Sequence, residues 1–131
     1  SVMKLSSLFV PLLKKADEPS IINISSIAAR SGGAPTAIIY AAAKSAIDSL
    51  TRGMAKGLAP KIRVNAVAPG VIETNFHERF TSTEQMEIFS QATPLKKNGN
   101  GIHVAMAVKM LVGNNFITGE TIDVNGGLFM R

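Results

Sequence analysis

Apolar residues recur at helical spacing in three stretches of the chain, and each stretch predicts an amphipathic helix. These stretches are residues 1–15, 39–58 and 104–112. A fourth and more polar stretch, residues 81–92, also predicts a helix, and either Ser82 or Thr83 is a suitable N-cap.

Three short runs between these helices are rich in apolar and β-branched residues, which predicts strands. They are residues 20–25, 62–67 and 121–124. Gly32, Gly33 and Pro35 predict a loop over residues 28–35. Helices that alternate with strands predict an α/β fold with a parallel sheet and right-handed crossovers. Residues 20–25 are apolar on both faces, which is typical of a strand with a neighbouring strand on each side. We therefore expect that part of the sheet is missing from this chain.

Composition narrows the class of protein. The chain has 131 residues, 46% of them hydrophobic, which predicts one small globular domain. It contains no cysteine, so thiolate chemistry and disulfides are excluded. Its net charge is +5, but the basic residues are scattered and there are one Tyr and no Trp, which disfavours a nucleic-acid-binding role. No apolar run reaches the ~18 residues of a membrane span, and we expect a soluble, cytoplasmic protein without a metal site.

Tyr40 and Lys44 lie four residues apart in a predicted helix and therefore share one of its faces. A nearby ammonium favours the phenolate and lowers the pKa of a tyrosine, which suits that residue to proton transfer. The same spacing is also common in surface pairs without function.

Ser25 and Ser26 end the first predicted strand, at the edge of the sheet where open α/β folds bind their ligands. A serine hydroxyl there can hydrogen-bond a substrate oxygen on which negative charge develops. Helix or loop capping is the simpler alternative. The second strand reaches the same edge with Pro69 and Gly70, followed by Thr74, which is equally compatible with an ordinary turn.

Four motifs, in this order, closely resemble those of the classical short-chain dehydrogenase/reductase family. They are INISS at residues 22–26, YAAAK at 40–44, IRVNAVAPG at 62–70 and TGETIDVNGG at 118–127. The resemblance covers nearly the whole chain and matches the C-terminal catalytic half of a family member. It implies the second half of a Rossmann-type doubly wound parallel sheet, with about three parallel strands and flanking helices, as a single partial domain over residues 1–131.

The resemblance also implies a reaction, the interconversion of an alcohol and a carbonyl by NAD(P)-dependent hydride transfer. Tyr40 would be the acid/base, Lys44 would lower its pKa, and Ser26 would orient the substrate oxygen. Residues 75–96 would cover a small-molecule alcohol or carbonyl substrate. The helices at residues 1–15 and 40–58 would form the interface of a homodimer or homotetramer.

Cofactor contacts are implied at the same edge of the sheet. Tyr40 and Lys44 would hold the nicotinamide ribose, and the carboxamide would be held by the backbone of Ile72 and the hydroxyl of Thr74. The turn that shapes this contact is Pro69-Gly70.

The family's glycine-rich cofactor turn is not found in these residues, so no phosphate loop lies within the chain. The string Gly99-Asn100-Gly101 follows no predicted strand and is interpreted as a loop. Nothing selects NAD over NADP. A truncated, non-catalytic binding or structural protein therefore stays open as an alternative. His77 and His103 lack ligand spacing and are interpreted as non-catalytic, and Glu84 and Glu87 as a solvated helix face.

Overall fold

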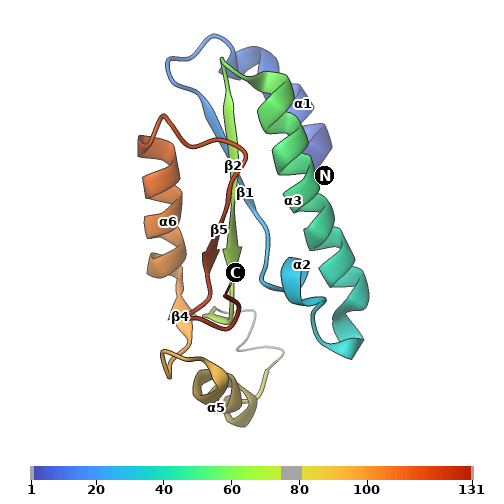
Figure 1. The fold of residues 1–131 in the computed structure, drawn as a ribbon, viewed down its shortest axis with the longest axis vertical. Coiled ribbons are helices and arrows are strands. Elements are labelled where there is room, and N and C mark those ends of the chain that lie inside the picture. The colour runs from blue at the N-terminus through green and yellow to red at the C-terminus, as the bar shows by residue number, and fades with distance from the viewer. Residues whose placement is uncertain (1, 75–80, 131) are drawn as a thin grey trace.

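A computed structural model describes residues 2–74 and 81–130 of the chain (Figure 1). Its centre is a parallel sheet of three strands, as the alternating pattern predicts, and the strands lie in the order β1-β2-β5. The strands are β1 (Ser20–Ile24), β2 (Arg63–Pro69) and β5 (Thr121–Val124). In register, Val67 of β2 lies between Ile24 of β1 and Ile122 of β5.

Helices cover both faces of this sheet (Figure 1). Helices α1 (Val2–Leu13) and α3 (Ile38–Leu58) lie on one face, and α6 (Gly101–Gly113) lies on the other. The α/β prediction and the long helices are therefore confirmed. None of the described helices is long and apolar enough to cross a membrane.

The core is built around β2. Val64, Ala66, Val67 and Ala68 are completely buried, because helices cover both faces of this strand and other strands flank both of its edges. Beside them, Ala55 of α3 packs against Val64 and Ile62, with half-buried side chains around the cluster. Strand β1 lies at the edge of the sheet instead, and 46% of Ile24 is exposed.

The loop predicted over residues 28–35 is wrong in part, because helix α2 (Ala28–Ser31) and a 3-10 helix η1 (Pro35–Ala37) occupy it. The backbone N–H of Ala28 donates to Ser26 Oγ (3.2 Å), which satisfies a donor at the start of α2. Gly32 ends the turn at φ 82°, a left-handed conformation that favours glycine.

The loop predicted at Gly99-Asn100-Gly101 is also wrong. Strand β4 (Gly99–Asn100) pairs in parallel with β3 (Ile72–Glu73), which forms a second and smaller sheet. Helix α6 then starts three residues earlier than expected, because the Asn100 side chain accepts from the N–H groups of Ile102 and His103. His103 Nδ1 accepts from the N–H of Asn100 in return, which completes a capping box. Helix α5 (Thr83–Ala92) confirms Ser82 as its cap, since Ser82 Oγ accepts from the N–H of Gln85 (3.1 Å).

Candidate functional site

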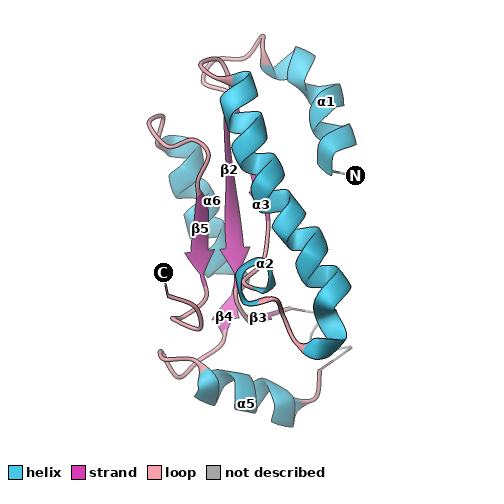
Figure 2. Ribbon diagram, turned by 45° about the vertical axis from the view of Figure 1, so that its right-hand side comes forward, coloured by secondary structure: helices cyan, strands magenta, loops and turns pink. Residues whose placement is uncertain are grey.

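Several elements meet at the carboxyl end of the central sheet. Figure 2 shows that the arrowheads of β2 and β5 point toward the end of the molecule where α2, the start of α3 and the small sheet β3-β4 gather. Parallel strands direct their carboxyl ends to one edge, and this is where open α/β sheets bind ligands. The residues predicted to form the site come from these elements.

Tyr40 and Lys44 occupy successive turns at the start of α3. Lys44 Nζ lies 5.7 Å from the centroid of the Tyr40 ring. It also donates to the carbonyl of Ile24, the last residue of β1, at 2.9 Å. Half of Tyr40 is exposed, so its ring is accessible from outside the chain while Lys44 is held against the strand end.

Ser26 lies directly beyond the end of β1 and is buried. Its Oγ accepts from the N–H of Ala28, so the hydroxyl hydrogen is not used in that bond and can donate elsewhere. The neighbouring Ser25 Oγ donates to the Lys44 carbonyl (3.3 Å), which ties α3 to the end of β1. The structure thus brings Ser26, Tyr40 and Lys44 to one edge of the sheet, while their roles stay predictions.

The end of β2 is fixed on both sides. The carbonyl of Pro69 accepts from the N–H of Ile27 (2.9 Å), and the N–H of Gly70 donates to the carbonyl of Val124 (2.9 Å). A Cβ atom at position 70 would lie 2.8 Å from Cα and Cβ of Asn125, so only glycine fits this close approach of two backbones. The turn that follows β2 is therefore held rigidly against β5.

The residues expected to contact a nicotinamide carboxamide follow this turn. Ile72 is half-buried and its backbone belongs to β3, where it pairs with Gly99. Thr74 is exposed. Both lie at the carboxyl edge of β2, and their cofactor roles stay predictions.

The predicted substrate-covering region, residues 75–96, is described in part. Residues 75–80, including His77, lie outside the described residues. The remainder contains α5 and its linker to β4, and Glu84 and Glu87 are exposed on α5 as expected.

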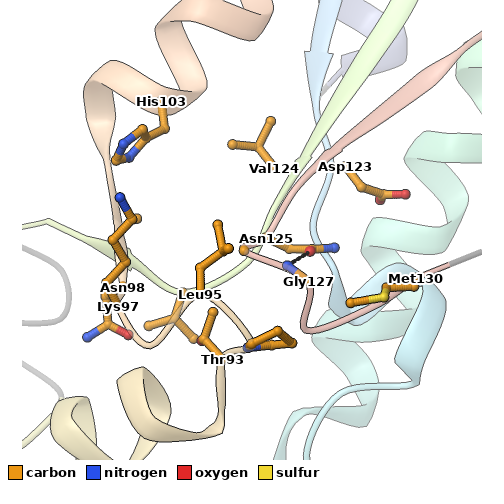
Figure 3. Close-up of a pocket in the computed structure, with 14 residues that line it drawn as sticks. Thr93, Leu95, Lys97, Asn98, His103, Asp123, Val124, Asn125, Gly127 and Met130 are labelled. Atoms are coloured by element: carbon orange, nitrogen blue, oxygen red, sulfur yellow. Dashed lines mark hydrogen bonds between the residues drawn. The ribbon is translucent and has the colours of Figure 1, made fainter.

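A cavity of about 470 Å³ lies between this linker, the end of β5 and the start of α6. Figure 3 shows Lys97 and His103 on one side of it and Asn125 and Gly127 on the other. Tyr40, Lys44 and Ser26 are not among the described residues that line it. The cavity is therefore separate from the predicted proton-transfer residues. Among the described residues, no group of three or more His, Cys, Asp or Glu side chains could hold a metal ion.

A layer of polar contacts between the helices and the sheet did not emerge from the sequence. Asn23 Nδ2 of β1 donates to Thr51 Oγ1 of α3 (2.9 Å), and both residues are buried. Across the sheet, Arg30 of α2 forms an ion pair with Asp123 of β5 (3.0 Å). One feature of the sequence could have indicated this ion pair. Helix α2 and strand β5 each contain a single charged residue, Arg30 and Asp123.

Comparison with known proteins decides the family. Residues 1–129 match the family model described as enoyl-(acyl carrier protein) reductase. The chain is 38% identical to the uncharacterized oxidoreductase YhxC of Bacillus subtilis, a match that covers 100% of this chain and 46% of the relative. The chain belongs to the short-chain dehydrogenase/reductase family. The predicted resemblance to this family is thereby confirmed.

Other short-chain dehydrogenase/reductase relatives agree. The 3-oxoacyl-[acyl-carrier-protein] reductase FabG of Vibrio cholerae is 35% identical, over 99% of this chain and 54% of the relative. The crystal structure of a short-chain dehydrogenase/reductase from Brucella melitensis superposes with a TM-score of 0.79 at 40% identity, covering 86% of this chain and 46% of that one. Aldohexose dehydrogenase of Thermoplasma acidophilum gives 0.90 at 31% identity, covering 96% and 54%. These structures confirm the Rossmann-type fold, and the chain spans about half the length of the relatives it matches.

Proposed function

We propose that this chain is the catalytic part of an NAD(P)-dependent short-chain dehydrogenase/reductase that interconverts an alcohol and a carbonyl. One observation carries the proposal. Lys44 donates a hydrogen bond to the Ile24 carbonyl and lies beside the accessible Tyr40 ring, and Ser26 lies at the same edge of the sheet. An ammonium, a phenol and a serine hydroxyl at a ligand-binding edge suit the transfer of a proton to or from an oxygen.

In the direction of reduction, Tyr40 donates its phenolic proton to the substrate oxygen. The nicotinamide cofactor, when bound, supplies the hydride that reaches the carbonyl carbon, so hydride and proton together convert the carbonyl to an alcohol. Ser26 donates its hydroxyl hydrogen to the same oxygen and stabilises the negative charge that develops there. The positive charge of Lys44 stabilises the phenolate that Tyr40 becomes.

The donor set at this edge fits the nicotinamide end of such a cofactor. An ammonium has three N–H donors. Lys44 donates one of them to the carbonyl of Ile24, which leaves two N–H donors for the ribose hydroxyls. The exposed Thr74 hydroxyl and the backbone near Ile72 supply polar groups of the kind that an amide binds. The rigid turn at Pro69 and Gly70 keeps these groups at the end of β2.

Self-association also belongs to the proposal. Helix α1 leaves Leu5, Leu8, Phe9 and Leu12 more than half exposed. A groove between α1 and α3 has residues such as Val10, Leu50 and Met54 along its walls. Apolar helix faces of this kind are typical of interfaces, and they suit a homodimer or homotetramer.

A non-catalytic binding or structural protein is the second candidate. Such a protein would keep this fold without binding the cofactor phosphates, for which residues 1–131 contain no glycine-rich turn. The two candidates differ in whether the intact gene product oxidises NAD(P)H.

The decisive experiment measures NAD(P)H oxidation by the intact gene product with a carbonyl panel that includes a 3-oxoacyl thioester and aldehyde and ketone substrates. We expect turnover with at least one carbonyl, and a loss of about 100-fold or more in kcat for Tyr40→Phe. Ser26→Ala should lower kcat, whereas Ser49→Ala on the exposed part of α3 should not. No turnover with any carbonyl and either cofactor would favour the non-catalytic candidate, and an intact-mass measurement would show whether residues precede Ser1.

A further inference from the structure

Arg30 links the segment that carries Ser26 to a strand far away in the sequence. Its Nε lies 3.0 Å from Asp123 Oδ1, and its Nη2 donates to the carbonyl of Thr121 at 3.2 Å. The side chains of Arg30 and Asp123 are only 16% and 18% exposed, so the pair lies largely out of water. In Figure 3 the Asp123 side chain points away from His103.

Ser26 belongs to the same small structural unit as Arg30. Its carbonyl accepts from the N–H of Ala29 (3.0 Å), and its Oγ accepts from the N–H of Ala28 (3.2 Å). One residue further, the carbonyl of Ile27 accepts from the N–H of Arg30 (3.0 Å). The position of the Ser26 hydroxyl therefore follows the position of α2.

A single helical turn does not persist in isolation, because its few hydrogen bonds do not offset the entropy of ordering the chain. Besides its packing against α3, helix α2 is held by three polar contacts among the described residues. The N–H of Ile27 donates to Pro69 on β2, Ser45 Oγ on α3 donates to the carbonyl of Ala29 (2.8 Å), and Arg30 reaches β5. The first two are single bonds between neutral groups, whereas Arg30 makes a charged pair and a charge-assisted hydrogen bond, which are stronger.

We propose that Arg30 is a positioning residue for Ser26. Through Asp123 and the Thr121 carbonyl it fixes α2 on the end of β5, and this holds the Ser26 hydroxyl where the substrate oxygen binds. The inference rests on the proposed function, because it assumes that Ser26 contacts a substrate. A role in stability alone is the competing interpretation, and the two make different predictions.

The first test is a double-mutant cycle on the intact gene product, with Arg30→Met made in the wild type and in Ser26→Ala. We expect Arg30→Met to lower kcat about tenfold while the KM for NAD(P)H stays within about twofold, since small misplacements of a catalytic group slow the reaction. In the Ser26→Ala background the same change should lower kcat no further, because residues that act as a unit are not additive. Arg52→Met, an exposed arginine on α3, is the matched control and should leave kcat unchanged.

The second test does not depend on turnover. Amide hydrogen exchange reports the bond from the N–H of Ala28 to Ser26 Oγ, and Arg30→Met should lower protection at Ala28 about tenfold while Val64 in β2 keeps its protection. Arg30→Lys retains the charge and should restore part of both kcat and protection, and it replaces Arg30→Met if that variant does not fold.

Additive losses in the cycle, or equal losses of protection at Ala28 and Val64, would overturn the positioning role in favour of general stability. If the wild-type protein is active and Arg30→Met has the same kcat, the positioning role is overturned as well. If the wild type oxidises no NAD(P)H, the proposed function fails. The link between Arg30 and Ser26 is tested separately, and unchanged protection at Ala28 in Arg30→Met would overturn it.

Discussion

Strands β1 and β2 are both short and rich in apolar residues but have very different surroundings. They pair in parallel so that Ile24 and Val67 are partners in register. Val67 is completely buried, whereas Ile24 is 46% exposed, because among the described residues β2 has a strand on each side and β1 has one only on the β2 side. A strand with the composition of a central strand therefore occupies an edge.

The comparison shows what the edge of β1 requires. Exposed apolar edge strands present unpaired backbone groups and favour association with another strand. The same strand ends in the Ile24 carbonyl that holds Lys44 and leads directly into Ser26. The order of the candidate site thus depends on an element that is itself only partly covered by the described chain.

The largest contrast should come from the same substitution at the two register partners. Val67→Asp places a carboxylate in a site without water, and we expect a loss of more than about 4 kcal/mol in the free energy of unfolding, enough to prevent folding. Ile24→Asp leaves its carboxylate half-exposed and should cost less than about 1 kcal/mol. Chemical denaturation of residues 1–131 should show a cooperative unfolding transition for Ile24→Asp and none for Val67→Asp, and the same behaviour in both variants would show that β1 and β2 are equally buried in solution.

A second contrast concerns how firmly β2 anchors its neighbours. Arg63 donates to three carbonyls at the end of α6 and just beyond it, those of Leu111, Val112 and Ile117 (2.8–3.2 Å). Because these bonds satisfy carbonyls that have no partner within the helix, we expect Arg63→Met to lower the free energy of unfolding by about 2 kcal/mol. Arg52→Met on the exposed part of α3 is the matched control, with an expected change below about 0.5 kcal/mol. A thermal or denaturant melt in which both variants lose the same amount would contradict this role of β2.

A third and smaller effect concerns the edge itself. Residues 1–131 expressed alone should self-associate, and Ile24→Lys should weaken the association about tenfold, because charged residues protect exposed edges. Phe116→Lys is the control, since Phe116 is 96% exposed but lies in the loop after α6 and not on β1. Analytical ultracentrifugation measures the association constants. A strictly monomeric and highly soluble chain would contradict the interpretation of β1 as an unsatisfied central strand.

Much of this architecture could be predicted from the sequence, because it depends on local pattern. The strand at Thr121–Val124 was predicted with its observed bounds, since the pair Gly126-Gly127 follows it closely. The helix at residues 101–113 was predicted too short, because its first turn depends on the reciprocal cap between Asn100 and His103 and not on apolar spacing. The pairing of β3 with β4 could not be predicted, because two-residue strands carry no periodicity.

The candidate site shows the same division. Tyr40, Lys44 and Ser26 could be singled out because their motifs are local. The pairing of Arg30 with Asp123 could not, because the two lie far apart in the sequence and only the folded sheet brings them together.

The central claim is that Tyr40 transfers the proton while hydride passes between the cofactor and a substrate carbon. The most direct measurement supplies the intact gene product with NAD(P)H deuterated at the transferring position and a carbonyl substrate, and analyses the alcohol by mass spectrometry. We predict one deuterium on the carbinol carbon, and a rate at least about 100-fold lower for Tyr40→Phe. An undiminished rate of deuterium transfer in Tyr40→Phe, or no transfer to any carbonyl in the wild type, would contradict the account.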